Sequence, residues 1–497
     1  MKKNFIYTLL VSSVFIATNA YAQSSEQALK LDQLKNLASA VENHGLKANW
    51  YVNEQFNAQL NSALMNTNPT AVDLLIANIA DQIAKDLSRG RVLSNSFSDK
   101  VRIPGKEYSP IHRQFVQLYL SQQMSLEQLI AQISPKNIYY QNSLSAFRQL
   151  HKIAQDGSWA QLPAKAKLSN LKIGTKNPTL ITFLRQRLNN LGYANDITST
   201  EFDLDLNESV MQFQENYNLV ADGVIGSGSW KTLNQDINQL LTQAMMNLDR
   251  SRWLPDTMPS EYIFVNLAAQ RFNMFQNGQI VLDFKTINGR VDRQTPLLFD
   301  SVKNIVLNPT WTVPFSIFVK DKLPELQKDP GYVERLNMKV IDDLSGQEVS
   351  TYSVNWLTEN PEDLKYTLVQ RPGRGNALGY IKFPLQNPYA IYLHDTDSRQ
   401  LFDQNPRLFS SGCVRLSKPF DLAEKLLENP KWTATSLQMA TEFNTQPDVQ
   451  PQWLKTKRAV PVYLFYQTII SNNGRIVILP DAYDLDGSAY RRLTGKK

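Results

Sequence analysis

The chain has 497 residues with a single cysteine, and its formal net charge at pH 7 is +6. One cysteine excludes an internal disulfide, and the length allows two to four domains, each held by its own apolar core. Its charges are interspersed without a long basic run, which argues against nucleic acid as a partner. A mild positive charge is compatible instead with an anionic polymer.

The chain begins with the features of a secretory signal peptide at residues 1–22. Lys2 and Lys3 are followed by a mainly apolar run over residues 5–17 and by a small-x-small cleavage pattern over residues 20–22. The apolar run is too short for a comfortable membrane span. We therefore expect export to the periplasm. The alternative is that the segment is not cleaved and anchors the chain to a membrane.

Residues 23–170 have the periodicity of amphipathic helices, and we expect a helical scaffold domain there. Apolar side chains recur at helical spacing in four segments, which are residues 27–40, 71–87, 112–120 and 126–133. The histidines of this part, His44, His112 and His151, are isolated in sequence. They are expected to be surface or internally satisfied histidines and not metal ligands.

A compact helical module is predicted over residues 176–240. Helical patterns at 180–191 and 208–217 precede an Asp-Gly-Val-Ile-Gly turn at 222–226, and Trp230 and Leu233 follow on a third helix. This pattern resembles the small helical peptidoglycan-binding domain. The alternative is a generic three-helix bundle in which these residues only pack.

From residue 250 to 480 the pattern changes to strands. Residues 262–267 form one apolar strand, and residues 271–276 and 279–284 flank an Asn-Gly pair that predicts a tight hairpin turn. The second hairpin strand is expected to end near Asn288-Gly289. Trp311 stands between two prolines and is expected to form a rigid aromatic wall.

Residues 320–375 look like an insertion in this strand region. Helical patterns occur at residues 323–336 and 361–366, separated by a polar stretch that is poor in strand signals. The insertion runs into a glycine-rich basic loop at 370–379, where Asn376 is a candidate substrate-binding residue. Long inserted segments are often lids, and we expect this one to cap a cleft.

After the cysteine, a helix is predicted at 417–427 with Ser417 as its N-cap. Residues 461–468 and 475–479 are expected to pair as a hairpin around Asn473-Gly474. The tail, residues 481–497, contains a calcium-loop-like segment, but Ala482 and Leu493 occupy positions that need oxygen ligands. We expect no metal and no organic cofactor.

The segment at residues 389–416 carries the chemistry. It holds the only cysteine, Cys413, nineteen positions after His394. A thiol can act as a nucleophile when a base lies beside it, and Gly412 permits a strained turn or a close approach. The alternative is a buried structural cysteine, but the Ser-Ser-Gly sequence before Cys413 makes a poor core strand.

These residues resemble the L,D-transpeptidases of bacterial cell-wall synthesis, whose motif is His, a spacer, Ser/Thr-His-Gly-Cys, an apolar residue and Asn or Arg. The chain departs from it at Ser411, where many members have a second histidine. The resemblance implies an α+β multidomain fold. Its parts are a mostly β catalytic domain over residues 250–480 with the inserted cap, the helical peptidoglycan-binding domain and the helical scaffold.

The resemblance also implies roles. Cys413 attacks the donor stem, His394 is the base, the backbone carbonyl of Asp395 orients the imidazole, and the backbone N–H of Cys413, with that of Gly412, binds the oxyanion. Residues that shape the substrate site are Tyr392, Ser411, Arg415, Trp311 and Asn376.

The implied reaction joins two peptidoglycan stem peptides by a 3→3 cross-link with release of D-Ala, and a carbapenem should acylate Cys413. Other cell-wall synthesis enzymes are further candidate partners. Three alternatives stay open: an L,D-carboxypeptidase, a transpeptidase that attaches a lipoprotein, and a non-catalytic wall-binding scaffold. A papain-like protease is disfavoured because its Cys-before-His order is absent.

Overall fold

The computed structural model describes residues 25–97, 100–162, 166–193, 195–357, 361–442 and 449–494, so the predicted signal peptide lies outside the described residues. The chain divides into two compact units, each described by itself. The first contains Met1–Ser98, Pro104–Met258 and Thr468–Lys497, and the second contains Asp99–Ile103 and Pro259–Gln467. The prediction of a multidomain α+β chain is confirmed. Within the described ranges, no helix is long and apolar enough to cross a membrane.

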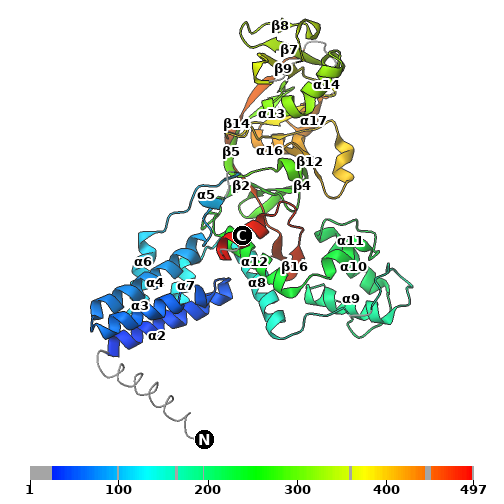
Figure 1. The fold of residues 1–497 in the computed structure, drawn as a ribbon. Helices are drawn as coiled ribbons and strands as arrows, with labels where there is room; N and C mark the ends of the chain where they lie inside the picture. The colour runs from blue at the N-terminus through cyan, green and yellow to red at the C-terminus, as the bar shows by residue number, and fades with distance from the viewer. Residues whose placement is uncertain are drawn as a thin grey trace. The chain divides into compact units, whose positions relative to one another are not determined.

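The first unit begins with a group of packed helices, drawn in blue and cyan in Figure 1. They are α2 (Ser25–Ala40), η1 (Val41–His44), η2 (Ala48–Trp50), α3 (Glu54–Met65), α4 (Pro69–Arg89), α5 (Ser94–Phe97), α6 (Pro110–Leu120), α7 (Leu126–Ile133) and α8 (Ile138–Gln155). Their starts follow from capping chemistry. Asn68 accepts a hydrogen bond from the Ala71 N–H ahead of α4, and Ser125 and Gln128 form a capping box at α7.

The four predicted helical stripes coincide with α2, α4, α6 and α7, and their apolar faces share one core. Its fully buried members include Leu34, Ile76, Ile83 and Leu129. Helices α3 and α8 were not predicted, because Asn, Gln and Ser interrupt their apolar stripes. These helices are stabilised by packing against neighbours and not by a strong local pattern.

A second helical group of the same unit contains α9 (Pro178–Asn190), α10 (Leu204–Asn216) and α11 (Ser227–Leu233), followed by α12 (Ile237–Ser251). The first three match the predicted helical module. A hairpin from the end of the chain, β15 (Ile469–Asn472) and β16 (Arg475–Ile478), contacts this group. The Tyr217 hydroxyl donates to the Ile476 carbonyl at 2.5 Å, and the Ile476 N–H donates to the Leu191 carbonyl. Helix α18 (Leu485–Thr494) completes the unit.

The hairpin prediction was right in its turn and wrong in its first strand. Asn473-Gly474 does join two paired strands, but the first strand is β15 and not residues 461–468. The apolar residues up to Phe465 belong to β14 (Gln452–Phe465) in the large sheet of the second unit. Both segments are rich in strand formers, so composition alone did not separate them.

The second unit is built on a large sheet that closes on itself. The hydrogen-bonded order runs β1 (Val101–Arg102), β5 (Leu297–Leu307), β10 (Ile381–Phe383), β11 (Leu393–His394), β13 (Val414–Leu416), β4 (Gln279–Gly289), β3 (Arg271–Gln276), β2 (Glu261–Asn266) and β14. Strand β14 pairs in parallel with β2 and antiparallel with β5, which closes the ring. The predicted Asn277-Gly278 hairpin joins β3 and β4, and β4 ends at Gly289 as expected.

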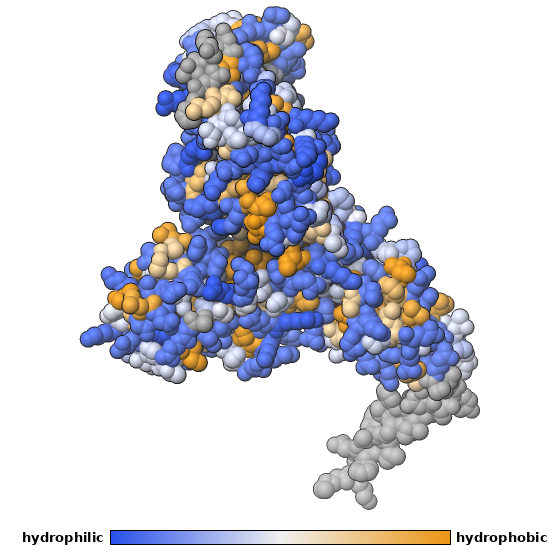
Figure 2. All heavy atoms as spheres, turned by 180° about the vertical axis from the view of Figure 1, so that it is seen from behind, coloured by the Kyte–Doolittle hydropathy of each residue, from blue (hydrophilic) through white to orange (hydrophobic). Residues whose placement is uncertain are grey.

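Shorter elements surround this sheet. They are η3 (Val291–Arg293), η7 (Arg399–Asp403), β12 (Leu408–Ser410), α16 (Pro419–Leu427) and α17 (Ala434–Ala440). The predicted helix after the cysteine is therefore present as α16. Its N-cap is Lys418 without a side-chain hydrogen bond, so the assignment of Ser417 as N-cap was wrong. The face of the molecule in Figure 2 is mostly hydrophilic, with apolar side chains in separate clusters.

The inserted segment has a sheet and a core of its own. Its strands, in hydrogen-bonded order, are β6 (Trp311–Thr312), β9 (Tyr366–Gln370), β7 (Met338–Asp342) and β8 (Glu348–Val349). Its helical elements are α13 (Phe315–Ile317), η4 (Phe318–Lys322), α14 (Leu323–Lys328), α15 (Tyr332–Arg335), η5 (Thr351–Ser353) and η6 (Pro361–Asp363).

The expectation of a strand-poor insertion was wrong, because β7 and β9 pair along five positions. The insertion is also wider than residues 320–375. Its buried cluster runs from Trp311 to Leu378 and includes Leu326, Val340 and Trp356. We call the segment from Trp311 to Leu378 the capping segment.

Candidate active site

Three neighbouring strands bring the predicted catalytic residues onto one face of the sheet. His394 on β11 pairs with Lys382 on β10 and with Arg415 on β13. Paired residues share a face, and so do residues two positions apart on one strand. Tyr392 and Cys413 therefore lie on the face of His394. The bond from the Val414 N–H to the Tyr392 carbonyl, at 3.2 Å, extends the ladder to this point.

This face borders a cavity of about 210 Å³, and the capping segment forms its other wall. Six of the residues predicted from the sequence line the cavity: Cys413, His394, Tyr392, Ser411, Arg415 and Trp311. The remaining lining residues are Pro314, Ser316, Ile317, Asp321, Lys322, Ala377, Leu378, Tyr389, Ala390, Ile391 and Ser410. The structure thus brings together residues that are far apart in the chain.

The Cys413 thiol is half-buried, and its Sγ donates to the Ala390 carbonyl at 3.6 Å. Burial raises the pKa of this thiol, because a thiolate loses solvation there. Hydrogen bonding from Tyr392 and the positive charges of Lys382 and Arg415 act in the opposite direction. The resting thiol is therefore protonated at neutral pH.

His394 is 4% exposed. Burial, with the Arg415 charge as the next cause, lowers the pKa of His394 to about 3, so the resting imidazole is neutral. Its ring lies 5.5 Å from the Tyr392 ring in an edge-on arrangement. Both side chains line the same cavity, and the imidazole is in the neutral form that a general base requires.

The predicted partner of His394, Asp395, follows it directly. The Asp395 backbone raises the His394 pKa, against burial, but Nδ1 of His394 has no hydrogen-bond partner within the described residues. The Asp395 carboxylate is engaged elsewhere, since it accepts from the Tyr380 N–H at 3.0 Å and from Arg399 at 2.9 Å. Orientation of the imidazole by the Asp395 carbonyl remains a prediction.

The loop before Cys413 is held by Ser410, which is 3% exposed. Its hydroxyl donates to the Cys413 carbonyl at 2.6 Å and accepts from the Gly412 N–H at 3.1 Å. Gly412 has a φ of +124°, and a Cβ there would lie 3.1 Å from Ile391, so glycine is required. The expectation that the Gly412 N–H helps to bind an oxyanion is not supported, because Ser410 already accepts that hydrogen.

The aromatic wall predicted at Trp311 belongs to the capping segment, on β6, and Trp311 is 9% exposed. Burial raises the pKa of Tyr392, and a hydrogen bond from Trp311 opposes that shift. Lys382 Nζ lies 4.0 Å from the Tyr392 ring centroid, a cation–π contact next to the thiol. The Cys413 cavity therefore has one aromatic wall and several cations.

Asn376 is placed differently from the expectation. It is 1% exposed and does not line the cavity, although Ala377 and Leu378 do. Its amide donates to the carbonyls of Pro309 and Arg371 and accepts from the Leu378 N–H. Asn376 therefore shapes the glycine-rich loop, and a contact of Asn376 with substrate stays a prediction.

Two features of the site were not predicted. Lys382 is brought to the thiol by strand pairing, for which only the Ile-Lys-Phe alternation gave a local signal. Arg293 donates to both oxygens of Asp321, at 2.5 and 2.6 Å, and to the Ser411 hydroxyl at 3.0 Å. Asp321 belongs to the capping segment and Ser411 to the catalytic loop, so Arg293 ties the two walls of the cavity together.

No group of three or more His, Cys, Asp or Glu side chains suited to a metal occurs in the described part of the chain.

Comparison with known proteins agrees with this geometry. Residues 260–447 match the family described as "L,D-transpeptidase catalytic domain", residues 178–233 match "Putative peptidoglycan binding domain", and residues 20–146 match "Scaffold domain". A Haemophilus influenzae protein named "Putative L,D-transpeptidase" is 35% identical over 250 residues, which is 50% of this chain and 48% of that protein. The match thus spans about half the length of this relative.

Solved structures with similarity to the chain include three L,D-transpeptidases. The enzyme from Stackebrandtia nassauensis is 11% identical with a TM-score of 0.25, covering 63% of this chain and 100% of the other. The enzyme from Xylanimonas cellulosilytica is 13% identical with a TM-score of 0.17, covering 60% and 99%. A cysteine-to-serine mutant from Enterococcus faecium is 12% identical with a TM-score of 0.19, covering 55% and 86%.

The catalytic match takes in Cys413, His394 and most of the closed sheet. Residues 260–447 of the chain are thus similar to an L,D-transpeptidase catalytic domain, and residues 178–233 are similar to a putative peptidoglycan-binding domain.

Proposed function

We propose that the protein is a periplasmic enzyme that forms 3→3 cross-links between peptidoglycan stems by acyl transfer through Cys413. The observation that carries this proposal is the shared cavity, where Cys413 and His394 face an aromatic and cationic wall on the capping segment. In this proposal residues 1–22 direct export, residues 176–240 bind the wall, and residues 23–170 support the catalytic domain.

The first step is attack on a tetrapeptide stem. His394 takes the thiol proton while Sγ of Cys413 attacks the carbonyl carbon of the third residue, a diamino acid. Since both groups are neutral at rest, proton transfer accompanies the attack and no standing ion pair is needed. The backbone N–H of Cys413 is the proposed donor to the oxyanion, because the Gly412 N–H is taken.

Collapse of the tetrahedral intermediate breaks the bond to the terminal D-Ala. That residue leaves as the amine after receiving the proton from His394, and a thioester remains on Cys413. The side-chain amine of a second stem then attacks the thioester and loses its proton to His394, which passes that proton to the departing thiolate of Cys413. The products are the new amide and the free thiol, so no cofactor is consumed.

The ligand-contacting roles follow from position. Lys382 and Arg415 offer positive charge beside the thiol, where they can attract a stem carboxylate and stabilise negative charge on the sulfur. Tyr392 and Trp311 form the apolar wall for the stem backbone. Ser411, tied to Arg293, lies where the catalytic loop meets the capping segment.

Intact-protein mass spectrometry tests the proposal. The mature protein is incubated with disaccharide-tetrapeptides, and separately with a carbapenem, with Cys413→Ala as the control. A drug adduct on Cys413 and a dimer lacking one D-Ala support the proposal. Shortened tripeptides alone indicate a carboxypeptidase. No adduct and no product from a folded protein refute catalysis and leave a wall-binding scaffold.

A further inference from the structure

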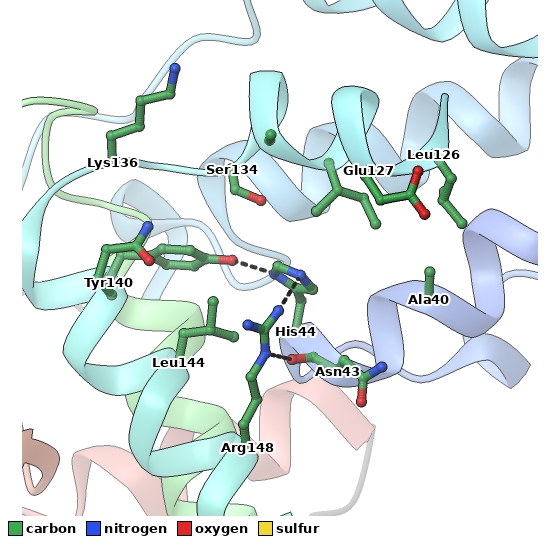
Figure 3. Close-up of a pocket in the computed structure, with 13 residues that line it drawn as sticks. Ala40, Asn43, His44, Leu126, Glu127, Ser134, Lys136, Tyr140, Leu144 and Arg148 are labelled. Atoms are coloured by element: carbon green, nitrogen blue, oxygen red, sulfur yellow. Dashed lines mark hydrogen bonds between the residues drawn. The ribbon is translucent and has the colours of Figure 1, made fainter. Parts of the chain in front are cut away.

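A second cavity lies in the helical unit. It has a volume of about 510 Å³, more than twice that of the Cys413 cavity, and it opens among α2, η1, α7 and α8 (Figure 3). Cavities of this size are in the range that binds small ligands. Its lining residues are Ala40, Asn43, His44, Leu126, Glu127, Ile130, Ala131, Ser134, Lys136, Tyr140, Gln141, Leu144 and Arg148.

A hydrogen-bond chain that runs from buried Tyr140 and His44 to exposed Arg148 forms one wall of this cavity. Nδ1 of His44 lies 2.8 Å from the Tyr140 hydroxyl, and Nε2 of His44 lies 2.9 Å from an Arg148 nitrogen. Arginine can only donate, so Nε2 must accept and Nδ1 must carry the hydrogen that it donates to Tyr140. The Tyr140 hydroxyl hydrogen is then available for another acceptor.

His44 itself adds no charge to this wall. Burial, followed by the charges of Arg148 and Arg252, lowers the pKa of His44 to about 3, so the ring is neutral at physiological pH. Arg148 is held in place by its second bond, from Nε to the Asn43 carbonyl at 3.2 Å. The wall therefore presents a fixed guanidinium and a hydroxyl hydrogen, a donor set that suits a carboxylate.

The α7 side supplies complementary groups. Ser134 Oγ is buried and has no hydrogen-bond partner in the part of the chain that the structure describes. Glu127 keeps its carboxylate ionised, because a backbone N–H and then the Ser125 hydroxyl lower its pKa. In Figure 3, Ser134 and Glu127 face His44 and Arg148 across the cavity. Leu126 and Leu144 add apolar surface.

A smaller cavity of about 330 Å³ continues this one, since both are lined by Ala40, Asn43 and Leu126. Its further lining residues include Gln33, Asn36 and Ser39 along α2. Amide and hydroxyl side chains at this spacing can pair with the polar groups of an extended chain. The two cavities together form a groove, which we call the α2–α7 groove.

We propose that the α2–α7 groove binds a short peptide with a free carboxylate, held by Arg148, Tyr140 and Ser134, and with an amine that faces Glu127. A dianionic phosphate fits less well, because the Glu127 carboxylate stands on the opposite wall. A stem peptide with a diamino acid has both groups. Its identification as the natural ligand rests on the proposed function, and the groove is a second stem site remote in sequence from the thiol.

The test uses the full mature chain with Cys413→Ala, which blocks turnover. A tetrapeptide stem carrying a photoreactive diazirine near its N-terminus is cross-linked, and the labelled residues are mapped by mass spectrometry. We expect labels on residues 126–148 that are competed by unlabelled tetrapeptide acid and at least about tenfold less well by its C-terminal amide, since a charge-assisted hydrogen bond contributes that much.

Two variants and a control make the test specific. Arg148→Ala should reduce labelling of the α2–α7 groove at least about tenfold. Ser134→Ala should reduce it severalfold with an unchanged melting temperature, because Ser134 Oγ loses no native hydrogen bond. Lys152→Ala removes an exposed charge from the same helix outside the groove and should label normally.

Absence of labels on residues 126–148, equal competition by the acid and the amide, or normal labelling of both Arg148→Ala and Ser134→Ala would overturn the proposal. Its failure is distinguishable from failure of the proposed function. The thioester on intact Cys413 is measured separately and does not depend on the α2–α7 groove.

Discussion

Replacing Ser410 with alanine tests whether the catalytic loop is positioned by one side chain. The Ser410 hydroxyl connects the Gly412 N–H and the Cys413 carbonyl, at 3.1 and 2.6 Å. Alanine leaves both backbone groups without this partner in a buried loop. Two such hydrogen bonds contribute about 1–3 kcal/mol to stability. In a domain of this size, a loss of about 2 kcal/mol lowers the melting temperature by about 4–8 °C.

The larger effect should be on reactivity. The two bonds fix the turn that presents the Cys413 thiol and N–H, and small misplacement of reacting groups costs up to about 100-fold in rate. We expect carbapenem acylation of Ser410→Ala, followed by mass spectrometry over time, to be about 10- to 100-fold slower than that of the wild type.

Ser417→Ala is the matched control for this prediction. Ser417 directly follows β13, the strand after Cys413, and its side chain makes no hydrogen bond in the described structure, so this variant should melt and react normally. If Ser410→Ala acylates as fast as Ser417→Ala and melts at the same temperature, the positioning role of Ser410 is refuted.

Three further predictions concern the same site. Gly412→Ala should slow acylation, because a residue with a side chain is strained by about 1–3 kcal/mol at φ +124°; an unchanged rate would mean that the turn relaxes. Alkylation of Cys413 by iodoacetamide should rise with pH through an apparent pKa above the ordinary value of about 8.5, and a plateau near neutral pH would instead reveal a standing thiolate–imidazolium pair. Arg293→Gln should raise KM for the donor stem more than it changes kcat, with a stability loss of at most about 1 kcal/mol. The Arg293 hydrogen bond lowers the Asp321 pKa, so the Arg293–Asp321 pair stabilises the fold above the unfolded pKa of an aspartate, and this stabilisation is lost as the pH falls through the folded pKa. Wild type and Arg293→Gln should therefore converge in stability in acid, and a constant difference would contradict this account.

The parts of the fold that could be predicted from the sequence are those with strong local signals. The apolar stripe of residues 71–87 became α4, and Asn277-Gly278 became a hairpin turn, because both patterns act within a few residues. Helix α12 was not predicted, because its buried face includes polar residues such as Arg250 and Asn247 and so lacks a regular apolar stripe. Arg250 pairs with Asp486 across more than 200 residues, and that contact leaves no local pattern.

The candidate site divides in the same way. Cys413 and His394 could be found because they share a short motif, and Tyr392 and Arg415 follow from strand alternation beside them. Lys382 and Arg293 could not be found, because their place beside the thiol depends on β10 pairing with β11 and on the capping segment folding back. The hydrogen bonds of Asn376 within the glycine-rich loop could not be predicted either, because the sequence does not show whether a polar loop residue faces the loop or the cavity.

The strand that closes the large sheet, β14, is also the last strand of that sheet to be made. Val462 pairs with Ile263 on β2, and Leu464 pairs with Leu298 on β5. Both strands are synthesised long before β14 and lack this partner until β14 has been made. As the chain emerges, Cys413 is available well before the ring around it can close, and contacts of such long range form slowly. A nascent or truncated chain that stops short of Phe465 would carry the Cys413 thiol on an open sheet, whose unpaired edges can pair with other chains.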